Sequence, residues 1–154
     1  DVTDALAAGL YDVLHFTGHG VFRAPDPNHS GMELEAGDQL VPEDISGILR
    51  NLGKASPLVF LNACQLGRSN FALTDVGGWA AQFLRANAAA FIGAYWSVYD
   101  DSALAFARTL YEKLLDGDTI AHAVHAARLA ARDDGDPSWL AYTVFAHPGA
   151  RVEG

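Results

Sequence analysis

The sequence contains a single cysteine, Cys64, and few basic residues, and both shortages exclude certain kinds of protein. One cysteine cannot form an intrachain disulfide, and it is too few for a thiolate zinc or iron–sulfur site. Ten Lys and Arg stand against nineteen Asp and Glu, which gives a net charge of −9. This charge repels phosphate backbones and anionic lipid headgroups, so it argues against nucleic acid and membranes as partners and favours cationic peptides.

Long apolar runs and targeting signals are also absent from the sequence. No apolar run approaches the roughly 18 residues of a membrane span. The first four residues, Asp1-Val2-Thr3-Asp4, are acidic where a signal peptide is basic. Because the single cysteine allows no intrachain disulfide, we expect a cytoplasmic protein. Because the first residue is not Met, we also expect a fragment of a longer protein, or a processed product, with flanking domains.

The 154 residues, half of them apolar, have the length and composition of one globular domain with a sizeable core. Four short apolar runs, rich in β-branched and aromatic residues, predict buried strands over residues 11–16, 57–62, 90–95 and 141–145. Nearly continuous apolar character is typical of strands that are covered on both faces, as in a parallel sheet.

Helical patterns occupy residues 42–52, 76–86, 101–115 and 119–132. Pro42 suits a first helical turn, Gly117 a helix end, and Thr119 an N-cap. Residues 31–41 alternate apolar and polar side chains around a turn, which predicts a small hairpin. The order of elements predicts an α/β fold, a three-layer α/β/α sandwich with a mostly parallel central sheet, whose function lies at the carboxyl ends of the strands.

Two chemically active residues directly follow the first two predicted strands. His19 lies between Gly18 and Gly20, which allow a sharp turn or a close approach to a ligand, and Cys64 follows the second strand. Taken singly, they have ordinary interpretations as a turn histidine and a buried, inert cysteine. Taken together they are more specific, because the ends of sequential parallel strands are often neighbours. His15, inside the first strand, is interpreted as a core histidine hydrogen-bonded to a neighbour.

A thiol beside an imidazole is suited to nucleophilic catalysis. Only a small part of a free thiol is thiolate at neutral pH, but a nearby imidazole activates it and protonates the departing amine. Backbone N–H groups beside the pair would hold the oxyanion, and those of Gly20 and Cys64 are the natural donors.

An ordered set of motifs extends from Tyr11 to Phe145, nearly the whole chain. It comprises His-x-x-x-His-Gly at the end of the first strand, Asn-Ala-Cys-Gln-x-Gly at the end of the second, Gly78-Trp79-Ala80, Trp96-Ser97-Val98-Tyr99-Asp100, Tyr111, Leu114, Gly117, Ala123, Ala127 and Pro137-Ser138-Trp139. Together these motifs resemble the CHAT domain of the caspase-like (clan CD) cysteine peptidases. The resemblance implies a caspase-like sandwich and a single CHAT domain over residues 1–154.

The resemblance implies a cysteine endopeptidase in which Cys64 is the nucleophile, His19 the catalytic histidine and the Gly20 amide part of the oxyanion hole. Gln65 would be a loop residue beside the nucleophile. The family's acidic position after the third strand corresponds to Asp100.

Three acidic residues are candidates for receiving a basic substrate side chain: Asp75, Asp100 and Asp101. Asp75 and Asp101 also suit helix N-caps, an alternative that the sequence leaves open. The chain departs from the commoner pattern at Asn62, at Tyr99 and at His147-Pro148. Tyr99 bears on any inherited substrate preference.

The resemblance further implies a protein or peptide substrate, a flanking repeat or sensor domain, and regulated bacterial proteolysis in stress, defence or cell-death signalling. No cofactor is expected, because the Gly-rich stretches lack the phosphate-binding motifs of nucleotide sites. No metal is expected either. His122 and His125 lie three residues apart on a predicted helix, but no further ligand is suggested nearby, and a solvated helix face is the simpler interpretation.

Two alternatives belong to other functional classes. A catalytically silent interaction module would keep the fold and bind a partner chain, and it predicts an unreactive thiol. A flavodoxin-like receiver or cofactor domain fits the fold class, but the sequence lacks its phosphate loop or acidic pocket. The presence of both His19 and Cys64 favours the peptidase over the silent module.

Overall fold

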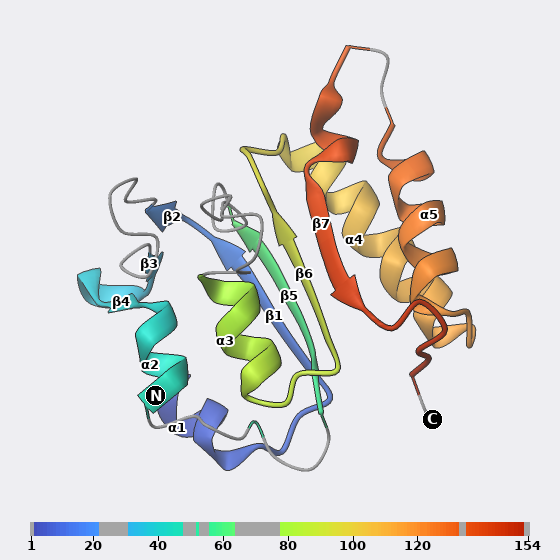
Figure 1. Cartoon of the computed structure of the whole chain (residues 1–154). Helices are drawn as coiled ribbons and strands as arrows, with labels where there is room; N and C mark the ends of the chain where they lie inside the picture. Colours follow the sequence, from blue (N-terminus) through green and yellow to red (C-terminus); the bar gives the residue numbers. More distant parts are fainter. Residues whose placement is uncertain are drawn as a thin grey trace.

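The computed structural model describes residues 2–21, 31–47, 52, 56–63, 78–132 and 135–152. Its central sheet has the strand order β1-β5-β6-β7 (Figure 1). The strands are β1 (Val13–Gly18), β5 (Leu58–Ala63), β6 (Ala90–Ala94) and β7 (Tyr142–Ala146). β1 and β6 both pair with β5 in parallel, whereas β7 runs antiparallel to β6. All four predicted strands and the mostly parallel sheet are thereby confirmed.

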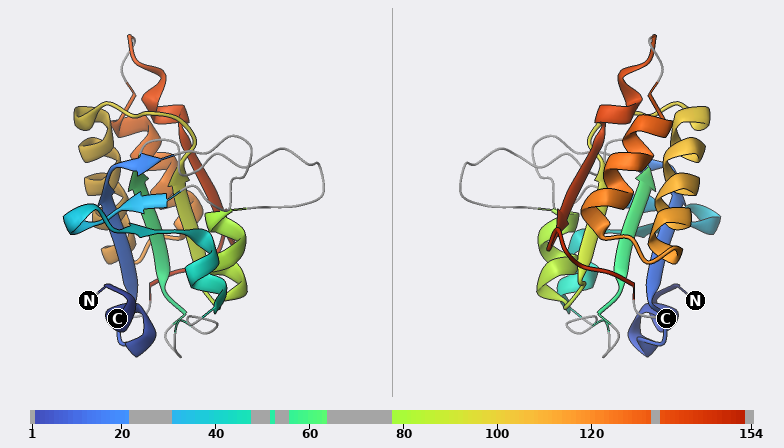
Figure 2. Two further views of the ribbon diagram at one scale, coloured as in Figure 1. Left: turned by 90° about the vertical axis from the view of Figure 1, so that its left-hand side faces the viewer. Right: turned by 90° about the vertical axis from the view of Figure 1, so that its right-hand side faces the viewer.

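Helices cover both faces of this sheet, which confirms the three-layer α/β/α prediction. α4 (Asp100–Leu115) and α5 (Ile120–Ala130) lie on one face, and α3 (Trp79–Arg85) and α2 (Pro42–Gly47) lie on the other (Figure 2). Residues 48–51, 76 and 77, which belong to two of the predicted helices, lie outside the described residues. α1 (Val2–Ala8) was not predicted from the sequence, and its Leu6 packs into the core on the α3 side.

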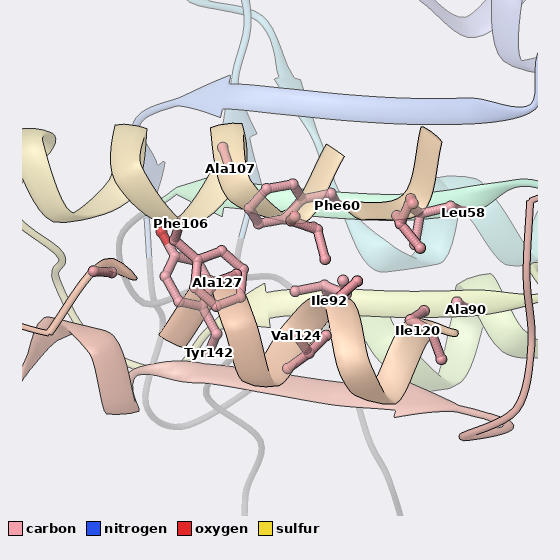
Figure 3. Close-up of a cluster of buried hydrophobic side chains, with 14 of the residues drawn as sticks. Leu58, Phe60, Ala90, Ile92, Phe106, Ala107, Ile120, Val124, Ala127 and Tyr142 are labelled. Atoms are coloured by element: carbon pink, nitrogen blue, oxygen red, sulfur yellow. The ribbon is translucent and has the colours of Figure 1, made fainter. Parts of the chain in front are cut away.

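The two-residue alternation of β5 divides the core between the faces. Val59 and Leu61 belong to the cluster under α3, and Leu58 and Phe60 belong to the cluster under α4 and α5. Figure 3 shows this second cluster, in which the Phe60 ring lies among side chains of α4, α5 and β7. β5 is buried on both faces, which explains why its sequence is a nearly continuous apolar run.

A smaller sheet lies at the carboxyl end of β1 (Figure 1). It joins β2 (Gly20–Val21), β3 (Gly31–Glu33) and β4 (Gln39–Leu40) in the order β2-β3-β4, with antiparallel pairing throughout. β3 and β4 confirm the hairpin predicted over residues 31–41. β2 was not predicted, because a strand of two residues leaves no detectable periodicity. Only His19 separates β1 from β2, so the histidine lies at the junction of the two sheets.

No helix in the described part of the chain combines the length and the apolar character needed to cross a bilayer.

Thr119 caps the N-terminus of α5, as predicted. Its backbone is extended, and its hydroxyl accepts a hydrogen bond from the His122 N–H at 3.3 Å. A capping oxygen satisfies one of the N–H groups that have no partner within the helix.

We predict that Thr119→Ala lowers the free energy of unfolding by about 1 kcal/mol, because the replacement removes the capping oxygen. Thr119→Ser is the matched control, since it keeps that oxygen, and it should retain most of the stability. Urea unfolding followed by circular dichroism measures both variants. Equal losses in the two variants would show that the hydroxyl does not cap the helix.

Candidate active site

His19 stands at the carboxyl edge of the central sheet, where its side chain is exposed to solvent. Gly18, the residue before it, is the register partner of Ala63, the last residue of β5. Ala63 is also the residue before Cys64 in the sequence, so the chain segments that lead to the two predicted catalytic residues end side by side. Cys64, Gln65 and Asp75 lie outside the described residues.

The N–H of Gly20 is left unused by the ladder between β2 and β3. Gly20 is paired with Met32 and Val21 with Gly31, and the Glu33 N–H donates to the His19 carbonyl at 3.0 Å. This pattern makes Gly20 and Met32 a non-hydrogen-bonded pair of the antiparallel ladder. In such a pair the N–H points away from the partner strand, so the Gly20 N–H is directed away from β3.

A cleft of about 400 Å³ opens beside His19, between the ends of the strands and helix α4. β1 and the junction after it contribute four residues to the sheet side of the cleft: His15, Thr17, Gly18 and His19. β5 and β6 add Asn62, Ala63 and Ala94. The volume lies within the range of sites that accept small ligands or single side chains.

The opposite wall comes from α4 and the residues before it: Val98, Asp100, Ala103, Leu104 and Ala107. The last four are spaced at i, i+3, i+4 and i+7, which places them on one stripe of the helix. Methyl groups dominate this wall, and Asp100 is the only carboxylate among the described residues that line the cleft.

The three acidic candidates therefore have different outcomes. Asp100 lines the cleft, whereas Asp101 is exposed but is not among the residues lining it. The alternative of Asp101 as an N-cap is wrong, because Tyr99 occupies the N-cap position of α4 and both aspartates lie in its first turn. There they favour the helix through its positive N-terminal end. The prediction for Asp75 falls outside the described residues.

His15 also lines this cleft. Its ring stacks on Phe60, with centroids 4.6 Å apart and an interplanar angle of 15°, and contacts Tyr111 at 5.6 Å. Its Nε2 is hydrogen-bonded to Thr17 Oγ1 at 3.1 Å. Burial of the stacked face lowers the pKa of His15 from its ordinary value.

The interpretation of His15 as a core histidine was thus correct about the hydrogen bond and wrong about the position. Odd-numbered residues of β1 face α4, but α4 lies over β5 and leaves part of this face uncovered. Both His15 and Thr17 are exposed as a result. Strand periodicity gives the face on which a side chain lies, but not whether a helix covers it.

Asn62 is held by a hydrogen bond that sequence reasoning missed. Its Oδ1 accepts from the buried Tyr142 hydroxyl at 2.9 Å, across 80 residues of chain. The Tyr142 ring is fixed in turn by stacking on Phe106, with centroids 3.8 Å apart. The only signal in the sequence was the unusual Asn at position 62, and nothing in a sequence identifies a partner so distant.

A second hydrogen-bond network braces the rim of the cleft. Asp136 accepts from the Ser102 hydroxyl at 2.5 Å and from the Ser138 hydroxyl and N–H at 2.6 and 2.8 Å. The Ser138 hydroxyl also accepts from the Tyr99 N–H at 3.2 Å, directly before Asp100. Burial alone would raise the pKa of Asp136, but these hydrogen bonds lower it overall. The C-terminal segment thereby fixes the start of α4.

The described residues contain no group of three or more His, Cys, Asp or Glu side chains arranged to hold a metal ion. His122 is exposed and pairs with Asp118, with Nδ1 and Oδ1 3.0 Å apart. The hydrogen bond from His122 lowers the pKa of Asp118. Both His122 and His125 are on the exposed side of α5, in line with the interpretation of a solvated face.

Comparison with known proteins gives a family and a fold. The family model of the CHAT domain matches residues 1–148. No curated protein matches the chain at a significant level. The crystal structure of the Arg-specific cysteine proteinase gingipain R superposes with a TM-score of 0.64 and 17% sequence identity, over 98% of this chain and 35% of that one.

A structure described simply as a protease gives a TM-score of 0.64 at 16% identity, over 96% of this chain and 36% of that one. The chain thus spans about a third of the length of these two proteins. At such identities the similarity shows a common fold, the caspase-like sandwich.

We predict that Tyr142→Phe lowers the free energy of unfolding by about 1–2 kcal/mol, because the partly buried Asn62 oxygen loses its donor. Tyr111→Phe is the matched control: the Tyr111 hydroxyl is buried without a hydrogen-bond partner among the described residues. Removing it should cost nothing or stabilise the fold slightly. Urea unfolding measures both, and equal losses would contradict the proposed role of the Tyr142 hydroxyl.

Proposed function

Because the chain belongs to the CHAT domain family, we propose that it is a cysteine endopeptidase that cleaves a protein substrate through Cys64 and His19. The observation that carries the proposal is the parallel register of β1 and β5. It ends with Gly18 opposite Ala63, one residue before His19 on one strand and one residue before Cys64 on the other. A nucleophile and its acid–base partner need this kind of adjacency.

The alternation of β5 supports the same pairing. Phe60 and Asn62 face the α4 side of the sheet, where the cleft lies. In the sequence, position 64 has the same parity as these two residues, which is the basis for proposing the thiol on that side. His19 follows His15 and Thr17 in the same alternation on β1 and lines the cleft with them. The proposal thus gives the cleft a thiol and an imidazole at its mouth.

The proposed reaction has two stages. The Cys64 thiolate attacks the carbonyl carbon of the scissile peptide bond, and His19 protonates the departing amine, which leaves a thioester. A water molecule, deprotonated by His19, then attacks the thioester and releases the acid product and the free thiol. No cofactor or metal is required for either stage.

The oxyanion formed in both stages would be held by the N–H groups of Gly20 and Cys64. The Gly20 N–H is directed away from β3 and is not consumed by the hairpin ladder. A donor that is already oriented costs no reorganisation when the negative charge develops. A glycine at this position also leaves room for the substrate carbonyl.

Asp100 is the proposed receiver of a basic side chain at the cleavage site. It is the carboxylate of the cleft wall, and the whole chain carries a net charge of −9. The structural neighbour gingipain R is an Arg-specific proteinase. Asp75 and Asp101 remain weaker candidates, the latter because it lies outside the cleft lining.

The wider setting is also part of the proposal. The family resemblance favours a cytoplasmic bacterial protein that acts in regulated proteolysis beside a repeat or sensor domain. The domain would then cleave a protein substrate in response to a signal received elsewhere in a longer chain.

The rate of thiol alkylation as a function of pH tests the pairing of Cys64 with His19, because Cys64 is the only thiol. We predict that the native thiol reacts about tenfold faster near pH 7 than the thiol of the unfolded chain, since a neighbouring imidazole stabilises the thiolate. His19→Ala should abolish this advantage. His122→Ala, which removes an exposed histidine on α5, is the matched control and should keep it.

A thiol that is slower than the unfolded control at every pH, and indifferent to His19, would favour the silent interaction module instead. With a cleaved substrate in hand, Cys64→Ala should reduce cleavage by about 10³-fold or more. Retained cleavage in that variant would contradict the peptidase proposal.

The role of Asp100 is tested with two matched variants. We predict that Asp100→Asn lowers kcat/KM for substrates with Arg or Lys before the scissile bond by about tenfold or more, with little change for norleucine at that position. Asp101→Asn should leave both values near those of the original chain. Equal effects of the two variants would mean that only the general charge of the α4 terminus matters.

A further inference from the structure

The outward side of α5 carries no acidic or basic side chain other than histidine. Its exposed residues are Ala121, His122, His125, Leu129 and Ala130. Arg128, the one Lys or Arg of the helix, is partly buried, and its Nη2 donates to the Tyr142 carbonyl at 2.7 Å. Two copies of a chain with a net charge of −9 repel each other, so they meet most easily where neither presents a charged side chain. This side of α5 is such a surface.

Two histidines lie at the centre of that side. His122, His125 and Leu129 are spaced at i, i+3 and i+7, which places them on one stripe of the helix. The buried residues of the helix form the opposite stripe: Ile120, Ala123, Val124 and Ala127. Side chains three residues apart on a helix are neighbours, with Cβ atoms about 5–6 Å apart, and helical metal ligands use this spacing in Glu-x-x-His motifs. The imidazoles of His122 and His125 are therefore placed to bind one ion together.

Asp118 holds His122 in the orientation that a metal ligand needs. The His122 Nδ1 and Asp118 Oδ1 atoms are 3.0 Å apart, and this hydrogen bond is the main reason why the pKa of Asp118 is lowered. Because the bond places the N–H on Nδ1, the lone pair of the neutral ring lies on Nε2, where an ion can bind. Histidines that bind metals in proteins almost always donate their other N–H to a carboxylate, a carbonyl or a water in this way.

One chain supplies too few ligands for a complete site. In the part of the chain that the structure describes, no third His, Cys, Asp or Glu side chain completes a metal-binding group with the two histidines. Zn²⁺ in structural sites takes four ligands in a tetrahedral arrangement, and imidazole nitrogen is among the ligands that it binds. A two-fold axis brings the same two histidines from each of two copies. We propose that α5 forms a zinc-dependent dimer interface, in which His122 and His125 of two copies of this chain bind one Zn²⁺ ion.

The surroundings of the histidines suit a second copy of the helix. Ala121 and Ala126 flank them, so no long side chain holds the partner helix away. Leu129, which is 54% exposed, lies on the same stripe and would lose contact with water in the dimer, which favours association. The positive charge of the ion would offset part of the repulsion between two acidic copies. α5 lies beside α4 (Figure 2) and contributes no residue to the lining of the cleft, so the inference does not rest on the proposed peptidase function.

Sedimentation velocity tests the interface in Cys64→Ala, a background that lacks the only thiol and so removes a competing zinc ligand. We expect a monomer in EDTA and a dimer with half an equivalent of Zn²⁺ per chain at about pH 7.5. His125→Gln should weaken zinc-dependent dimerisation by more than about 100-fold, because each copy loses a ligand, and Asp118→Ala should weaken it about tenfold, because His122 loses its orienting carboxylate. His147→Gln, which removes an exposed histidine outside α5, is the matched control and should dimerise like the background.

Calorimetric titration with ZnCl₂ gives the stoichiometry and separates the outcomes. Half a zinc ion per chain, lost in both His122→Gln and His125→Gln, supports the inference. One ion per chain without a dimer would mean an adventitious ion only and would overturn it, as would a dimer that persists in EDTA or in both histidine variants. Circular dichroism checks that the variants fold, which replacement of an exposed side chain should permit. These measurements need no substrate, so their result is independent of whether the chain cleaves peptides.

Discussion

The parallel pairing of β1 with β5 is the constraint on which the rest of the site depends. A slip of one residue in β5 would turn Leu58 and Phe60 toward α3 and Val59 and Leu61 toward α4, and both core clusters would be lost. Burial on two faces therefore fixes the register far more firmly than backbone hydrogen bonds alone. The same register brings the ends of the two strands to one level, with Gly18 opposite Ala63. Core packing thus brings together the strand ends that precede His19 and Cys64.

The cleft beside this edge is built from distant parts of the chain. β1 supplies the side with His15 and Thr17, and α4 supplies the opposite wall. The described residues of the C-terminal segment do not line the cleft, but they hold residues on both of its sides. The Tyr142 hydroxyl donates to Asn62, and the Ser138 hydroxyl accepts from the N–H of Tyr99, just before α4. These bonds are partly buried, and a brace of this kind keeps a binding site within the narrow tolerances that recognition requires. Substitutions in the last quarter of the chain should therefore alter the cleft without touching a substrate.

The cleft exists because α4 does not cover β1. A helix placed over β1 would have buried the outer face of that strand and left no space for a ligand. Instead, α4 packs over Phe60, and it faces β1 with its Ala and Leu stripe, with Asp100 and with the Tyr111 ring that contacts His15. The exposed imidazole of His15 is stable there because Phe60 provides an aromatic surface for one of its faces. The polar His15 thus marks the part of the sheet that α4 leaves uncovered.

The sequence alone determined the strands, most of the helices, the layer architecture and the family. These depend on local features: apolar runs such as 58–61, the cap at Thr119, and motifs a few residues long. It also indicated which residues end the first two strands, because the chain order of a parallel sheet restricts its geometry. Only the tertiary structure decided that Asp100 rather than Asp101 lines the cleft, that His15 lies in it, and that Tyr142 holds Asn62. Each of those outcomes depends on contacts between segments many residues apart, and on which faces neighbouring elements leave open, and neither is encoded in local periodicity.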